Sequence, residues 1–84
     1  MDQTKVFLYT LSTCGHCKNI KKLLEENNIK YESADVDMAK RDEQIRLMAE
    51  MDKVSSSMSF PTLVIGDKVI VGFREAEIRE ALGL

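Results

Sequence analysis

Two cysteines separated by two residues lie where the chain changes from one type of secondary structure to another, and this junction most constrains the fold. Residues 6–9 form a continuous apolar run, which is typical of a strand covered on both faces. After the motif Cys14-Gly15-His16-Cys17, apolar residues recur at three- and four-residue spacing between charged ones. This pattern predicts an amphipathic helix that ends near Asn27 and Asn28. The cysteine motif therefore lies in the turn from a buried strand into the first turn of a helix.

The middle of the chain predicts a second strand and a second helix. Residues 31–36 are short, partly β-branched or aromatic, and bounded by polar residues, which favours a strand. In residues 39–51 apolar side chains recur at helical spacing. The residues expected to form the buried face of this helix are Ile45, Met48 and Ala49, with Leu47 and Met51 at its margins.

The last third of the chain predicts a hairpin followed by a helix. Two apolar runs, residues 62–65 and 68–71, are separated only by Gly66-Asp67, and glycine supplies the positive φ that tight hairpin turns require. Residues 75–82 then have helical periodicity and end at Gly83, which is a common helix cap.

The resulting order is β-α-β-α-β-β-α, an α/β arrangement. The first β-α-β unit should make its two strands parallel, and the hairpin then completes a four-stranded mixed sheet flanked by helices. The 84 residues can bury one core but not two, so residues 1–84 are expected to form a single domain. This order is that of the thioredoxin fold in its shortest form, although element order alone leaves other small α/β sandwiches open.

Charge and hydropathy exclude several classes of function. The formal net charge is -2, and both signs are spread along the chain, so we expect no nucleic-acid partner. The apolar-leaning stretch at residues 6–11 is too short for a signal peptide or a membrane span, which favours a cytoplasmic protein without a membrane partner. In that reducing compartment a disulfide that persists is usually catalytic or redox-sensing, so the two cysteines need a chemical explanation.

The position of each cysteine suggests its role. Cys14 should lie at the helix N-terminus, where free backbone N–H groups and the helix dipole favour a thiolate. Cys17 lies one turn later on the apolar side of the helix, which protects it from solvent and suits a resolving thiol. His16 and Lys18 add positive charge beside the thiolate and should stabilise the reduced state.

Other roles for the cysteine pair are less favoured than redox chemistry. A disulfide staple closing a ring of about four residues would gain only about 2 kcal/mol on the loop-entropy model. An isolated zinc site needs four ligands, whereas the chain offers two cysteines and one histidine in the same turn. Covalent c-type haem needs histidine directly after the second cysteine, where Lys18 stands. A metal or iron-sulfur site that uses Cys14 across a dimer remains an alternative.

Several segments together resemble the glutaredoxin family over nearly the whole chain. In order, these segments are residues 5–10, 14–17, 35–37, 60–62 and 72–73. The resemblance implies the glutaredoxin-sized thioredoxin fold and a cis peptide bond before Pro61, which would face the active site. It also implies that the backbone of Phe60 pairs with an extended thiol substrate, and that Gly72 and Phe73 belong to the substrate-binding surface.

The sequence departs from the family pattern where glutathione would bind. Many glutaredoxins have lysine at the position of Leu11, and an acidic residue near the position of Arg74, to hold glutathione. Between the cysteines, Gly15-His16 is similar to the dipeptide in the active sites of protein disulfide isomerases. This similarity implies a dithiol that is more oxidising than that of a thioredoxin. The string Gly72-Phe73-Arg74 is similar to that of small redoxins that donate electrons to ribonucleotide reductase and are reduced by thioredoxin reductase.

The sequence therefore predicts a thiol-disulfide oxidoreductase or electron carrier. Cys14 would attack a disulfide in a protein, or a mixed disulfide with glutathione, and Cys17 would displace the product. The electron donor would be glutathione, acting as a co-substrate, or thioredoxin reductase. We expect a monomer with no tightly bound cofactor and no metal.

Overall fold

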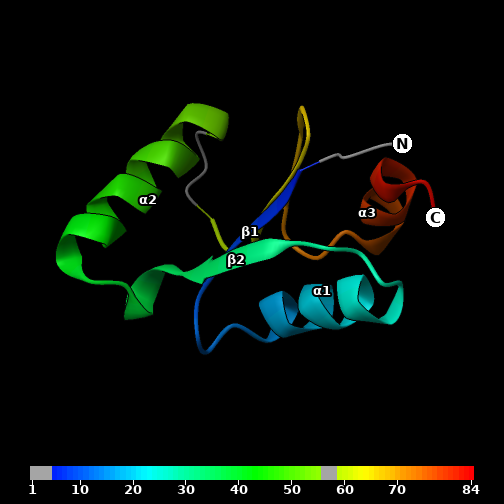
Figure 1. The fold of residues 1–84 in the computed structure, drawn as a ribbon, viewed down its shortest axis with the longest axis horizontal. Helices are drawn as coiled ribbons and strands as arrows, with labels where there is room; N and C mark the ends of the chain where they lie inside the picture. The colour runs from blue at the N-terminus through cyan, green and yellow to red at the C-terminus, as the bar shows by residue number, and fades with distance from the viewer. Residues whose placement is uncertain (1–4, 56–58) are drawn as a thin grey trace.

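The computed structural model describes residues 5–55 and 59–84 (Figure 1). The predicted element order is present, with one short 3-10 helix, η1, added between the second strand and the second helix. Along the chain the elements are β1 (Val6–Thr10), α1 (Gly15–Glu26), β2 (Glu32–Asp35), η1 (Val36–Met38), α2 (Arg41–Val54), β3 (Thr62–Ile65), β4 (Lys68–Val71) and α3 (Glu75–Leu82).

The four strands form one mixed sheet in the order β2-β1-β3-β4. β1 is parallel to β2 and antiparallel to β3, and β3 and β4 form the predicted hairpin. Tyr9 lies opposite Ala34 on one side and Thr62 on the other. The C-terminal ends of β1 and β2 and the N-terminal end of β3 therefore lie at the same end of the sheet.

Helices cover both faces of the sheet, as predicted: α1 and α3 lie on one face and α2 lies on the other (Figure 1). Under α1 and α3 the buried residues are Val6, Leu8, Ile20, Leu23, Leu24, Leu63, Ile65, Ile70 and Ile78. Under α2 they are Tyr9, Val36, Leu47 and Met51. Alternate residues of β1 enter the two cores, which explains why the sequence of this central strand is continuously apolar. Within the described part of the chain, none of the helices is long and apolar enough to cross a membrane.

The predicted buried face of α2 is wrong. Leu47 and Met51 are 2% and 0% exposed, whereas Ile45 and Met48 are 60% and 43% exposed, and Ala49 is also exposed. The residues expected at the margins are thus the ones that pack on the sheet. The helix is rotated about its axis relative to the prediction.

Polar contacts explain this rotation. The side-chain amide of Gln44 donates to the carbonyl oxygen of Val36 at 2.8 Å, and the hydroxyl of Tyr9 donates to Oε1 of Glu50 at 3.3 Å. Gln44 and Glu50 are half-buried beside Leu47, so part of the inward stripe of α2 is polar. The spacing of apolar residues does not predict such a stripe, because its polar residues, Gln44 and Glu50, are hydrogen-bonded to residues outside the helix.

We predict that Leu47→Ala destabilises the protein by about 2 to 5 kcal/mol, because it opens a cavity in the core under α2. Ile45→Ala, on the same helix, is the matched control and should change the free energy of unfolding by at most about 0.5 kcal/mol. Urea denaturation followed by circular dichroism measures both values. The opposite ranking would restore the face expected from the sequence.

Candidate active site

Cys14 is the N-cap residue of α1. Its backbone is extended, with φ -84° and ψ 115°, and its Sγ atom accepts a hydrogen bond from the backbone N–H of Cys17 at 3.2 Å. The N–H of Cys14 itself donates to the carbonyl oxygen of Leu11 at 3.1 Å, which closes the turn after β1. The half-exposed sulfur thus occupies the position where an N-cap oxygen usually lies, against a backbone N–H with no partner inside the helix.

Cys17 lies in a different environment one turn later. Its side chain is 1% exposed and lies on the same side of α1 as Ile20 and Leu24, which are fully buried. Burial raises the pKa of the Cys17 thiol to about 12, helped by its hydrogen bond to Cys14, while the charge of Lys21 acts in the opposite direction. Cys17 is therefore a protonated thiol at neutral pH.

The segment before β3 lies at the end of the sheet where β1 and β2 end. The Phe60-Pro61 peptide bond is cis, as the resemblance implied, and Pro61 is fully buried. The carbonyl oxygen of Pro61 accepts a hydrogen bond from the N–H of Gly72 at 2.9 Å. This bond connects the start of β3 to the segment that follows β4.

Phe73, the next residue, connects that segment to the cysteine motif. The rings of His16 and Phe73 lie nearly parallel, with an interplanar angle of 24° and centroids 6.4 Å apart. Phe73 is half-buried against the core under α1 and α3, so it supports that core and also borders the site. His16 is exposed. Lys18 is also exposed, and among the described residues its ammonium group makes neither a hydrogen bond nor an ion pair.

Asp37 is a residue of the site that the sequence did not reveal. Its two carboxylate oxygens accept hydrogen bonds from the backbone N–H and the hydroxyl of Ser12, at 2.9 and 2.6 Å. These bonds hold the pKa of the Asp37 carboxyl below its usual value. They join η1 to the loop that precedes Cys14. Asp37 lies in a segment that resembles the family, but only the fold shows that it contacts Ser12.

A second carboxylate, that of Asp35, lies at the end of β2. It accepts a hydrogen bond from the hydroxyl of Thr10, which is fully buried, and pairs with the ammonium of Lys21 at 3.8 Å. Lys21 is one helical turn beyond Cys17. The pair therefore links the C-terminal ends of β1 and β2 to the side of α1 that carries the buried thiol.

Residues 5–55 and 59–84 contain no group of three or more His, Cys, Asp or Glu side chains that could hold a metal ion. Both cysteines in this part of the chain are free thiols. The arrangement is thus a dithiol at a helix N-terminus, with an aromatic pair that includes His16 and a cis proline at the start of β3.

The sheet order, the helices on both faces and the dithiol in the first turn of α1 define a thioredoxin-fold protein. The glutaredoxin family model matches residues 6–70. A glutaredoxin-like 8.6 kDa protein in the rubredoxin operon of Clostridium pasteurianum is 34% identical over 71 residues, covering 84% of this chain and 88% of the relative. The chain belongs to the glutaredoxin family.

Solved structures agree with this assignment. Methanoredoxin from Methanosarcina acetivorans superposes with a TM-score of 0.92 at 41% identity, covering all of this chain and 90% of the other. A glutaredoxin from Methanosarcina mazei Go1 superposes with a TM-score of 0.87 at 44% identity, covering 95% of this chain and 79% of the other.

We predict that iodoacetamide modifies Cys14 at least about a hundredfold faster than Cys17 at pH 7.5, because Cys17 is buried and its thiolate is scarce. The modification of Cys17 should accelerate only as pH rises toward its raised pKa of about 12. Peptide mapping by mass spectrometry of the native protein, at short reaction times across pH, gives both initial rates. Equal rates at pH 7.5 would contradict the difference in environment.

Proposed function

We propose that this protein is a dithiol thiol-disulfide oxidoreductase in which Cys14 is the nucleophile and Cys17 the resolving thiol. The observation that carries the proposal is the contrast between the two sulfur atoms. One is half-exposed on a backbone N–H at the start of α1, and the other is buried one turn behind it. Membership of a family of thiol redox proteins supports the same chemistry.

The reaction proceeds by two exchanges between sulfur atoms. The Cys14 thiolate attacks one sulfur of a substrate disulfide, forms a mixed disulfide with it, and releases the other sulfur as a thiolate. Cys17 then loses its proton and attacks Sγ of Cys14. The second substrate thiol leaves, and a Cys14–Cys17 disulfide remains. Two electrons pass from the dithiol to the substrate, and two electrons from a thiol donor or a reductase restore the dithiol.

The high pKa of Cys17 separates these two steps in time. Burial is the largest cause of that pKa, and the contact with Cys14 adds to it. In the mixed disulfide the sulfur of Cys14 is bonded to the substrate, so the contribution of Cys14 to the raised pKa of Cys17 is lost. Lys21 still favours the Cys17 thiolate. Cys17 therefore becomes easier to ionise only after Cys14 has reacted.

The substrates we propose are disulfides in proteins, and mixed disulfides with glutathione. Phe60 would pair through its backbone with an extended chain, next to Pro61, and Gly72 and Phe73 would contact the same chain. The bond from Gly72 to Pro61 and the ring pair of Phe73 and His16 support this grouping. We further propose that the protein acts as a monomer in the cytoplasm.

We predict that Cys14→Ser abolishes turnover with a disulfide substrate, whereas Cys17→Ser accumulates a mixed disulfide on Cys14, because the second exchange has no thiol. Intact-mass spectrometry after incubation with disulfide-bonded insulin or with glutathione disulfide detects the adduct. An adduct that forms on Cys17 in the Cys14→Ser variant, with none on Cys14 in the Cys17→Ser variant, would reverse the two roles.

Whether glutathione is the electron donor depends on how tightly the protein binds it. Two residues argue for weak binding. Leu11 offers no cation to a glutathione carboxylate. Arg74 places a positive charge near the position where the family uses an acid. Its Nε donates to the carbonyl oxygen of Val71 at 3.3 Å and its guanidinium pairs with Glu77 at 3.9 Å, so it faces the start of α3. We propose thioredoxin reductase as the alternative donor.

We predict that Leu11→Lys increases the rate of reduction by glutathione about ten- to a hundredfold, because a charge-assisted contact contributes about 1.5 to 3 kcal/mol. Leu11→Met is the control of similar size without charge. Oxidation of NADPH in the presence of glutathione and its reductase, or of thioredoxin reductase alone, measures both routes at equal protein concentration. If glutathione already reduces the native protein rapidly and lysine adds nothing, Leu11 does not determine the donor.

A further inference from the structure

The outer edge of β4 has backbone groups that no strand pairs with in residues 5–55 and 59–84. Among these residues β4 is the last strand of the sheet and pairs only with β3. The turn Gly66-Asp67 makes Ile65 and Lys68 a hydrogen-bonded pair, so the backbone groups of Lys68 and Ile70 face β3. Those of Val69 and Val71 therefore face outward. One of them, the carbonyl oxygen of Val71, accepts a hydrogen bond from Arg74.

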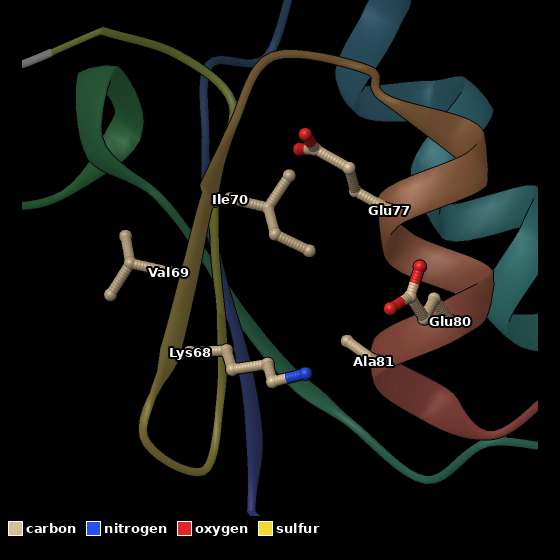
Figure 2. Close-up of a pocket in the computed structure, with 6 residues that line it drawn as sticks. All are labelled: Lys68, Val69, Ile70, Glu77, Glu80 and Ala81. Carbon is tan, nitrogen blue, oxygen red and sulfur yellow. The ribbon is translucent and has the colours of Figure 1, made fainter.

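A groove of about 420 Å³ runs between this edge and α3 (Figure 2). Its lining residues are Lys68, Val69, Ile70, Glu77, Glu80 and Ala81. Figure 2 shows Lys68 and Ile70 pointing from β4 toward α3, whereas the side chain of Val69 points to the opposite face of the sheet. Ile70 and Ala81 thus give the groove an apolar floor.

The charge of the groove is negative. Glu77 and Glu80 contribute two carboxylates from α3, against one ammonium from Lys68. In the part of the chain that the structure describes, the only ion-pair partner of Glu77 is Arg74, at 3.9 Å, and Glu80 and Lys68 form no ion pair. All three side chains are exposed. A positive side chain entering the groove would therefore meet an uncompensated carboxylate.

We propose that the β4 edge and the β4–α3 groove bind an extended segment of a partner protein, in which basic residues alternate with apolar ones. The segment would add a fifth strand by pairing with the outward backbone groups of Val69 and Val71. Because side chains alternate along a strand, every second one would reach the groove beside Glu77 and Glu80. The others would lie beside the side chains of Val69 and Val71 on the opposite face.

Charge argues against a second copy of this chain as the occupant. Symmetric antiparallel pairing of two β4 strands would place both α3 helices on the same face of the joined sheet. Each copy would then bring two carboxylates, of Glu77 and Glu80, and only one ammonium group, of Lys68, to that face, which is unfavourable. A basic segment meets the opposite charge. β4 also continues directly into Gly72 and Phe73, so one end of a bound segment would lie near Phe73, whose ring pairs with that of His16.

The test uses the double variant Cys14→Ser/Cys17→Ser, so that binding is measured without redox chemistry and its outcome is independent of the proposed function. The probe is a synthetic ten-residue peptide of alternating Lys and Val, acetylated and amidated at its ends. Titration followed by ¹⁵N-¹H NMR should give saturable shifts centred on the amides of Val69 and Val71. Glu77→Gln/Glu80→Gln should weaken binding about fivefold, as expected for the loss of two exposed ion pairs.

The control variant Glu26→Gln/Glu43→Gln removes the same charge from other helices and should leave the affinity unchanged. Equal weakening in both variants would reduce the effect to net charge and overturn the proposal. Equal binding of a Glu-Val peptide, or shifts confined to Phe60 and His16, would also overturn it. Sedimentation that shows a dimer, with concentration-dependent shifts at Val69 and Val71 before any peptide is added, would assign the edge to a second copy.

Discussion

The hydrogen bond from the backbone N–H of Cys17 to the sulfur of Cys14 is the contact on which the site depends. It requires Cys14 to be extended and Cys17 to be helical, so the strand must end and the helix must begin between them. That boundary fixes the direction of α1, and with it the side that carries Ile20 and Leu24 into the core. The same contact places one sulfur at the surface and the other inside. A single turn of the chain therefore both orients α1 and gives the two sulfur atoms different environments.

The rest of the site is assembled by bonds between segments that are far apart in the sequence. Asp37 holds the loop before Cys14 through Ser12, and the carbonyl oxygen of Pro61 holds Gly72. Both bonds lie at the end of the sheet where β1 and β2 end and β3 begins. Parallel pairing of β1 with β2 places η1 at this end, and antiparallel pairing of β1 with β3 places Pro61 there. These groups lie at one end of the sheet because the sheet is mixed.

The sequence predicted those features that depend on neighbouring residues. The start of α1, the turn at Gly66 and the cap at Gly83 all follow from local patterns, and each is present. The inward face of α2 was predicted wrongly, because Gln44 and Glu50 are stabilised by Val36 and Tyr9 and not by residues near them in the chain. The contact of Asp37 with Ser12 and the groove beside β4 were missed for the same reason. They arise only when strands and helices are placed together.

The dipeptide between the cysteines is less constrained by packing than the cysteines themselves. A Cβ atom added to Gly15 would meet no atom within 4 Å, and its backbone does not have a positive φ. Glycine is therefore not required there, and it costs more conformational entropy than most residues would. Its neighbour His16 is exposed, and its ring contacts only that of Phe73 among the described aromatic residues. Because neither residue supports the core, both positions can change the redox properties of the dithiol without changing the fold that holds it.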